Sequence, residues 1–93
     1  MNKAYVVIDL TVKDIGKMKQ YVQVAKELVT KHDGKFIANS EVEVLYGASD
    51  FSLKAIIEFP NVEYARAWYH STEYQKIIPI RSIAMDAQFH LIS

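Results

Sequence analysis

The stretch that decides the fold is AYVVIDLTVKDIGKMKQYVQVAKELVTKHDG, residues 4–34, because its apolar residues change from one spacing to another. Residues 4–10 are β-branched and apolar, and every second side chain falls on the same face, as in a β-strand. From Ile15 to Val29 the apolar residues recur at steps of three and four, which is the stripe of an amphipathic helix. Asp14 can cap this helix, and Gly34 is expected to supply the left-handed residue that ends it. The stretch therefore predicts a strand followed by a helix.

Beyond this unit, the chain continues as two strands joined by a turn. Residues 35–46 alternate around a weak break at Asn39-Ser40, which predicts a bent or bulged strand. Residues 47–50, Gly-Ala-Ser-Asp, form the expected hairpin turn. Residues 51–59 are the next strand, closed by Pro60, whose missing amide cannot continue a sheet ladder.

A second helical segment and a last strand complete the chain. Asn61 can cap a helix that runs to about His70, and a short helical turn follows at residues 72–75. Pro79 is expected to end or kink that piece, because it cannot donate a helical hydrogen bond. Residues 84–92 alternate as the final strand.

This order, β-α-β-β-α-β, predicts an α+β domain of the ferredoxin-like type. Right-handed crossovers place the first and third strands in the centre of a four-stranded antiparallel sheet, with two helices on one face. The 93 residues leave room for one core, so residues 1–93 are expected to form a single domain.

The composition narrows the function classes. The sequence is 51% hydrophobic, with six Tyr, four Phe and one Trp, and this is more apolar material than one small core hides, which favours self-association. Eleven basic residues balance eleven acidic ones without a run of like charge, so no nucleic-acid or membrane partner is expected. No stretch approaches the roughly 20 apolar residues that span a bilayer. The absence of cysteine fits a soluble protein of the reducing cytoplasm.

The phase of the strands predicts a sheet with two different faces. The face turned toward the helices is almost entirely apolar, whereas the opposite face, called the open face below, mixes charged and apolar side chains. The open face is expected to carry Tyr5, Val7, Asp9, Lys54, Ile56, Glu58, Asp86, Gln88, His90 and Ile92. A face that meets water would account for the charges. A second copy packed over it would account for the apolar residues as well, and would enclose a cavity between two sheets.

Three segments resemble the family catalogued as domain of unknown function 1330. They are YVVIDLTVKD (5–14), KHDGKFIANSEVEVLYG (31–47) and IIEFPNVEYARAWYHSTEYQKIIPIRSIAMDAQFHLI (56–92). The most specific part runs from Glu58-Phe59-Pro60 through Ala67-Trp68-Tyr69, Ser71 and Glu73-Tyr74 to Arg81. The pair Asp33-Gly34 departs from the Gly-Gly pair that many relatives show.

This resemblance implies the dimeric α+β barrel superfamily, in which two ferredoxin-like subunits pack sheet to sheet. The superfamily contains cofactor-free monooxygenases, muconolactone isomerases, haem-dependent enzymes and stress-related binding modules, and the family itself carries no established reaction. Function resides in the site rather than in the fold, so the resemblance does not choose among these activities.

Glu58 and His90 are the candidate catalytic residues. A desolvated Glu58 could act as a general base or hold a ligand hydroxyl, and its alternative role is an ion pair with Arg81 or Lys54 that fixes a dimer. A neutral His90 could relay a proton, although a lone histidine near a chain end is more often a surface or interface residue. The three histidines show no metal-binding spacing, so no metal, haem or other cofactor is expected.

The aromatic residues near the second helix allow two roles. Trp68 is expected in the core, whereas Tyr69 and Tyr74 could line the mouth of a pocket with their hydroxyl groups. Arg81 could bind a carboxylate, either that of a ligand or that of Glu58.

Three functions remain open at this point. The first is a homodimeric small-molecule-binding domain of unknown reaction, with a cavity at the open face lined by Tyr5, Asp9, Glu58, Tyr69, Arg81 and His90. The second is a cofactor-free enzyme of the monooxygenase or isomerase type, with Glu58 or His90 as the base. The third is a structural interaction module without a ligand, whose dimer interface holds paired charges and no void.

Overall fold

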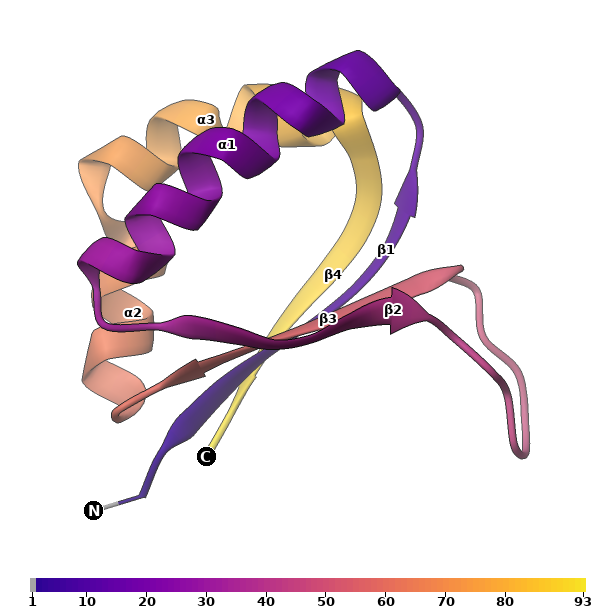
Figure 1. Ribbon diagram of the computed structural model, residues 1–93, viewed down its shortest axis with the longest axis horizontal. Helices are drawn as coiled ribbons and strands as arrows, with labels where there is room; N and C mark the ends of the chain where they lie inside the picture. The colour runs from indigo at the N-terminus through magenta and orange to yellow at the C-terminus, as the bar shows by residue number, and fades with distance from the viewer. Residues whose placement is uncertain (1) are drawn as a thin grey trace.

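The computed structural model describes residues 2–93, in which helices cover one face of an antiparallel sheet (Figure 1). The elements are β1 (Ala4–Val12), α1 (Ile15–Lys31), β2 (Lys35–Glu41), β3 (Leu53–Phe59), α2 (Val62–His70), α3 (Thr72–Ala84) and β4 (Met85–Ile92). The strands lie in the order β2-β3-β1-β4, so β1 and β3 are central as predicted. The α+β, ferredoxin-like class is confirmed, with three helices in place of the two expected.

Alternating burial along the central strands builds the core. Every second side chain of β1, from Ala4 to Leu10, is buried, and β3 repeats this pattern from Ala55 to Phe59. These side chains turn toward the helices, while the residues between them turn to the open face. The largest fully buried side chains are Trp68, Tyr74, Phe59, Ile57 and Val29.

Helix α1 begins as predicted and ends differently. Asp14 caps it, because the Asp14 carboxylate accepts a hydrogen bond from the backbone N–H of Lys17 at 2.9 Å. At the other end, the left-handed residue is Asp33 with φ of 61°, so the prediction that Gly34 takes this conformation is wrong. Aspartate tolerates a positive φ better than most residues because its short side chain can bond to the local backbone.

Gly34 is required for a different reason. A Cβ atom at this position would lie 2.5 Å from Cε1 of Phe59, in the buried aromatic part of the core.

We therefore expect Gly34→Ala to lower the free energy of unfolding by about 1–3 kcal/mol, the usual cost of overpacking. The matched control is Gly16→Ala in α1, which we expect to raise this free energy by roughly 0.5–1 kcal/mol. Urea denaturation measures both, and equal effects would contradict the role assigned to Gly34.

The second helical segment is longer than predicted. The side chains of Asn61 and Ser71 cap α2 and α3. Helix α3 continues through Pro79 to its end at Ala84, so the first of the two outcomes expected at Pro79, an end of the helix, is wrong. Pro79 is exposed, and water can meet the carbonyl group that loses its helical partner there. As a result, Arg81 belongs to a helix and not to a connecting segment.

Strand β2 is shorter and less covered than predicted. It ends at Glu41, and its irregularity lies between Phe36 and Ala38, slightly before the expected break. All seven of its residues are exposed, because no helix of the described residues packs closely against this strand. Figure 1 shows β2 below α1, at one edge of the sheet.

Candidate functional site

The open face carries the side chains that the strand phase predicted. Val7 of β1 lies opposite Ile56 of β3 on one side and His90 of β4 on the other. Asp9 of β1 lies opposite Lys54 of β3. Val7 and Ile56 are half-buried, whereas His90 on the edge strand is exposed. The open face therefore has an apolar centre beside charged residues.

Both carboxylates along the centre of this face are held in ion pairs. Lys54 Nζ lies 3.1 Å from Asp9 Oδ1. Glu58 Oε1 lies 3.0 Å from Lys3 Nζ and 3.8 Å from Lys35 Nζ. The expected pairing of Glu58 with Lys54 is wrong, because the register places Lys54 opposite Asp9.

Arg81 lies on the other side of the sheet, within the helix layer. Its Nη1 donates hydrogen bonds to Tyr69 Oη at 3.1 Å and to Tyr74 Oη at 3.0 Å. Its guanidinium carbon is also 4.7 Å from the ring centroid of Phe89, which packs against the core. The expected ion pair between Arg81 and Glu58 is therefore wrong.

The structure thus divides the six predicted site residues between the two sides of the sheet. The open face holds Tyr5, Asp9, Glu58 and His90. The helix layer holds Tyr69 and Arg81. Within one copy, Tyr69 and His90 both line a hollow beside α2 and β4, whereas the other four predicted site residues are not among those that line it.

A buried tyrosine pair extends the Arg81 contacts toward α1. The hydroxyl groups of Tyr74 and Tyr21 lie 2.7 Å apart, and their rings meet edge to face. Burial raises the pKa of both phenols above the ordinary value, because the charged phenolate is poorly solvated there. Burial lowers the pKa of Arg81, but the hydrogen bonds that Arg81 donates to Tyr69 and Tyr74 outweigh this effect, and the net direction is upward. The phenols of Tyr21 and Tyr74 thus stay neutral, and Arg81 stays charged.

This pair predicts an alkaline limit to stability. A phenol whose pKa is raised on folding contributes stability that is complete below its unfolded pKa of 10.0 and is lost as the pH rises above it. We expect Tyr21 and Tyr74, two of the six tyrosines, to ionise only when the chain unfolds. Ultraviolet absorbance of phenolate, followed together with circular dichroism, checks this. Ionisation of all six phenols in a folded protein would contradict it.

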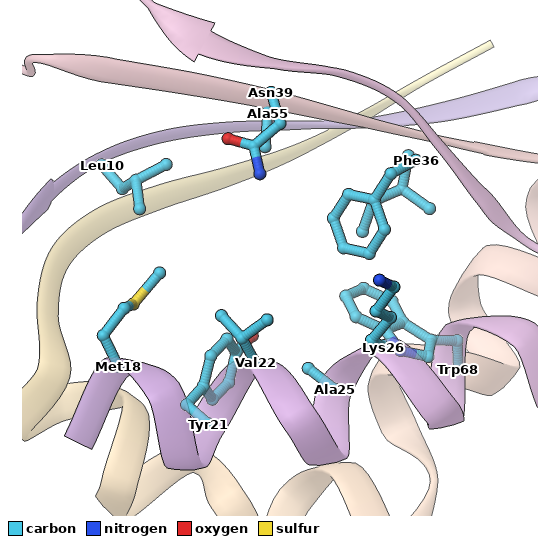
Figure 2. Close-up of a pocket in the computed structure, with 11 residues that line it drawn as sticks. Leu10, Met18, Tyr21, Val22, Ala25, Lys26, Phe36, Asn39, Ala55 and Trp68 are labelled. Atoms are coloured by element: carbon cyan, nitrogen blue, oxygen red, sulfur yellow. The ribbon is translucent and has the colours of Figure 1, made fainter. Parts of the chain in front are cut away.

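A cavity of about 200 Å³ lies between α1 and the sheet (Figure 2). Most of its lining is apolar, and the residues are Leu10, Met18, Tyr21, Val22, Ala25, Lys26, Phe36, Asn39, Ala55, Ile57 and Trp68. For comparison, an apolar cavity of about 150 Å³ holds benzene. The space therefore suits a molecule of about one aromatic ring.

The cavity has a buried floor and a more exposed rim. Trp68 and Tyr21 belong to the floor, and both are almost fully buried. Val22 of α1 and Phe36 of β2 are 41% and 40% exposed, and they stand at the rim with Lys26. Figure 2 shows Phe36 reaching from β2 toward α1 across this opening. A small molecule could therefore enter between α1 and β2.

Sequence reasoning missed this cavity because its lining residues follow the same apolar stripes as packed core residues. The signal that could have indicated it is a pair of small residues on facing elements. Ala25 of α1 and Ala55 of β3 both line the cavity, and neither side chain is long enough to fill it.

Trp68 also lines a second hollow, of about 250 Å³, beside α2 and β4. Its indole Nε1 is buried and has no hydrogen-bond partner within residues 2–93. Trp68 packs against the rings of Phe59, Tyr69 and Tyr74, and an aromatic face is a weak acceptor for an N–H group. Tyr69, His70 and His90 are also among the residues that line this hollow.

Two general features of the described residues bear on the function. Among residues 2–93, no three His, Asp or Glu side chains gather in a way that could hold a metal ion. None of the helices in this part of the chain has the length and apolar character needed to cross a bilayer.

Comparison with known families identifies the chain. Residues 3–93 match the family described as "Domain of unknown function (DUF1330)". The chain belongs to the DUF1330 family. No curated protein matches the sequence significantly.

Several solved structures share the fold of this DUF1330 domain. The RPA0582 protein of unknown function from Rhodopseudomonas palustris has a TM-score of 0.78 and 14% identity, over 97% of this chain and 80% of that one. A dimeric ferredoxin-like protein of unknown function from Jannaschia sp. CCS1 has a TM-score of 0.73 and 11% identity, over 99% of each chain. SnoaB, a cofactor-independent oxygenase from Streptomyces nogalater, has a TM-score of 0.72 and 11% identity, over 100% of this chain and 93% of that one. At these identities the likeness shows a common fold only.

Proposed function

We propose that this DUF1330 domain is a homodimer in which each copy binds a small, mostly apolar molecule between α1 and the sheet. The cavity of about 200 Å³ is the observation that supports the binding site. Protein interiors are close-packed, so the atoms lining such a space lack contacts that a bound molecule would supply. A further cavity at the open face needs a second copy to close it, and it stays a prediction.

The open face supports the homodimer. Its apolar centre, at Val7 and Ile56, is half-buried in one copy and would be buried by another sheet packed over it. The carboxylates of Asp9 and Glu58 are already paired with lysines of the same copy, so covering them leaves no unpaired charge. The Jannaschia protein, which has the same fold, is described as dimeric.

The connection between β2 and β3 supports the same arrangement. Residues 42–52 project from the end of the sheet as an arm (Figure 1), closed at its base by a hydrogen bond from the backbone N–H of Val42 to the Ser52 carbonyl at 3.0 Å. Leu45 and Tyr46 near its tip are 90% and 100% exposed. Exposed apolar groups of this kind mark interaction sites. In the dimer, we expect the arm to lie against the second copy.

A cofactor-free enzyme is the second candidate, and the common fold with SnoaB favours it. Such chemistry would depend on polar groups that line the cavity, namely Tyr21, Lys26, Asn39 and Trp68. Glu58 and His90 are poorer candidates for the base, because they lie on the opposite side of the sheet from this cavity.

We also propose a cytoplasmic location for the protein, which the cysteine-free sequence favours.

The binding proposal can be tested with toluene as a neutral probe of one ring. The chain has a single tryptophan, so a nitrogen–proton correlation spectrum of isotope-labelled protein contains one indole signal. Because Trp68 lines the cavity, the ring current of bound toluene should shift this signal in a saturable way. An interaction module without a ligand predicts no shift at any toluene concentration.

A further inference from the structure

Among residues 2–93, one charged side chain stands at the rim of the cavity, and it is positive. Lys26 of α1 lines the cavity, and no carboxylate is among the lining residues. Figure 2 shows its side chain rising from α1 toward Phe36 of β2, beside the opening. Lys31 of the same helix pairs with Glu73 at 2.7 Å, whereas none of the ion pairs within residues 2–93 involves Lys26.

Asn39 supplies a second polar group from the opposite wall. It lies on β2 opposite Ala55 of β3, and Figure 2 shows its amide directed from the strand toward α1. No side-chain hydrogen bond within residues 2–93 occupies this amide. An ammonium group and an amide are both hydrogen-bond donors, and together they present one positive charge.

We infer that the ligand is a small aryl carboxylate, with its ring in the cavity and its carboxylate at the rim near Lys26 and Asn39. This inference rests on the proposed binding function. The apolar floor, which includes Trp68, matches a ring and would reject a charge that has no partner there. Within the part of the chain that the structure describes, the rim offers a single cation. This matches a monoanion better than a phosphate dianion, because the second negative charge would find no partner there.

Two probes of the same shape test the charge. Phenylacetate and phenylacetamide share their ring and linker, and only the first carries a negative charge at neutral pH. We expect phenylacetate to bind about two- to fivefold more tightly, the range typical of an exposed ion pair. The shift of the Trp68 indole signal measures both affinities, and added salt should reduce the difference.

Matched lysine variants locate the charge. Lys26→Met keeps the apolar stem and removes the ammonium group, so the preference for phenylacetate should disappear. Lys17→Met makes the same change in the first turn of α1, away from the cavity, and should keep the preference.

The outcomes separate this inference from the function on which it rests. If both probes bind equally to the native protein, or if Lys26→Met keeps the preference, the carboxylate assignment is overturned while the binding cavity stands. If neither probe shifts the Trp68 signal, the binding proposal fails as well.

Discussion

Ile56→Glu will leave the domain folded but monomeric. Ile56 lies on the central strand β3, opposite Val7 and in the apolar centre of the open face. In a symmetric dimer the substitution places two carboxylates in the interface, one from each copy, while Lys54 and Lys3 already pair with Asp9 and Glu58. A buried charge without a partner costs about 3 kcal/mol or more of binding free energy. We therefore expect the dissociation constant of the dimer to rise more than about a hundredfold.

Sedimentation over a range of protein concentrations measures this change. Val24→Glu, which adds the same charge on the exposed side of α1, is the control and should leave the dimer intact. Tyr46→Ser, at the tip of the arm, should weaken the dimer by a smaller factor. If the native chain sediments as a monomer at every concentration, the open face serves another purpose and the dimer proposal is abandoned.

Ala25→Leu will abolish the binding of one-ring molecules without unfolding the protein. Ala25 lines the cavity from α1, and its side chain faces the space that Ala55 also leaves unfilled. Three added carbon atoms would occupy part of a volume that is only about 200 Å³. We expect at least about a tenfold loss of toluene affinity, because the probe and the leucine compete for the same contacts. Filling the space should preserve or raise the melting temperature.

The matched control for this variant is Ala65→Leu. Ala65 is also buried in a helix, but it lines the second hollow beside α2 and β4 rather than the cavity. This variant should bind toluene as the native protein does. Equal binding by Ala25→Leu and the native protein would show that toluene shifts the Trp68 signal from another position.

The two sides of the sheet differ in how far the sequence predicts them. The residues of the open face can be predicted from the alternation of side chains in β1 and β3, because a period of two fixes which side chains share a face. Its residues Val7, Asp9, Ile56 and Glu58 therefore lie where the sequence predicts them. The ion-pair partners do not follow from alternation, because they depend on the register between strands, which places Lys54 beside Asp9 rather than Glu58.

The helix layer is less predictable for two physical reasons. Pro79 is normally a helix terminator, but its exposed position lets α3 continue and carries Arg81 to the hydroxyl groups of Tyr69 and Tyr74. The cavity arises from unfilled volume rather than from a motif, and volume depends on how far α1 stands from the uncovered strand β2. Apolar periodicity indicates that a residue faces the core, but it does not indicate whether the core is filled there.

Crystals grown with para-bromotoluene would test the central claim most directly, because the anomalous signal of bromine locates the probe. The account predicts bromine between α1 and β2, near Trp68, with a second copy of the chain packed on the open face. Bromine bound on the open face, with the space beneath α1 empty, would contradict it.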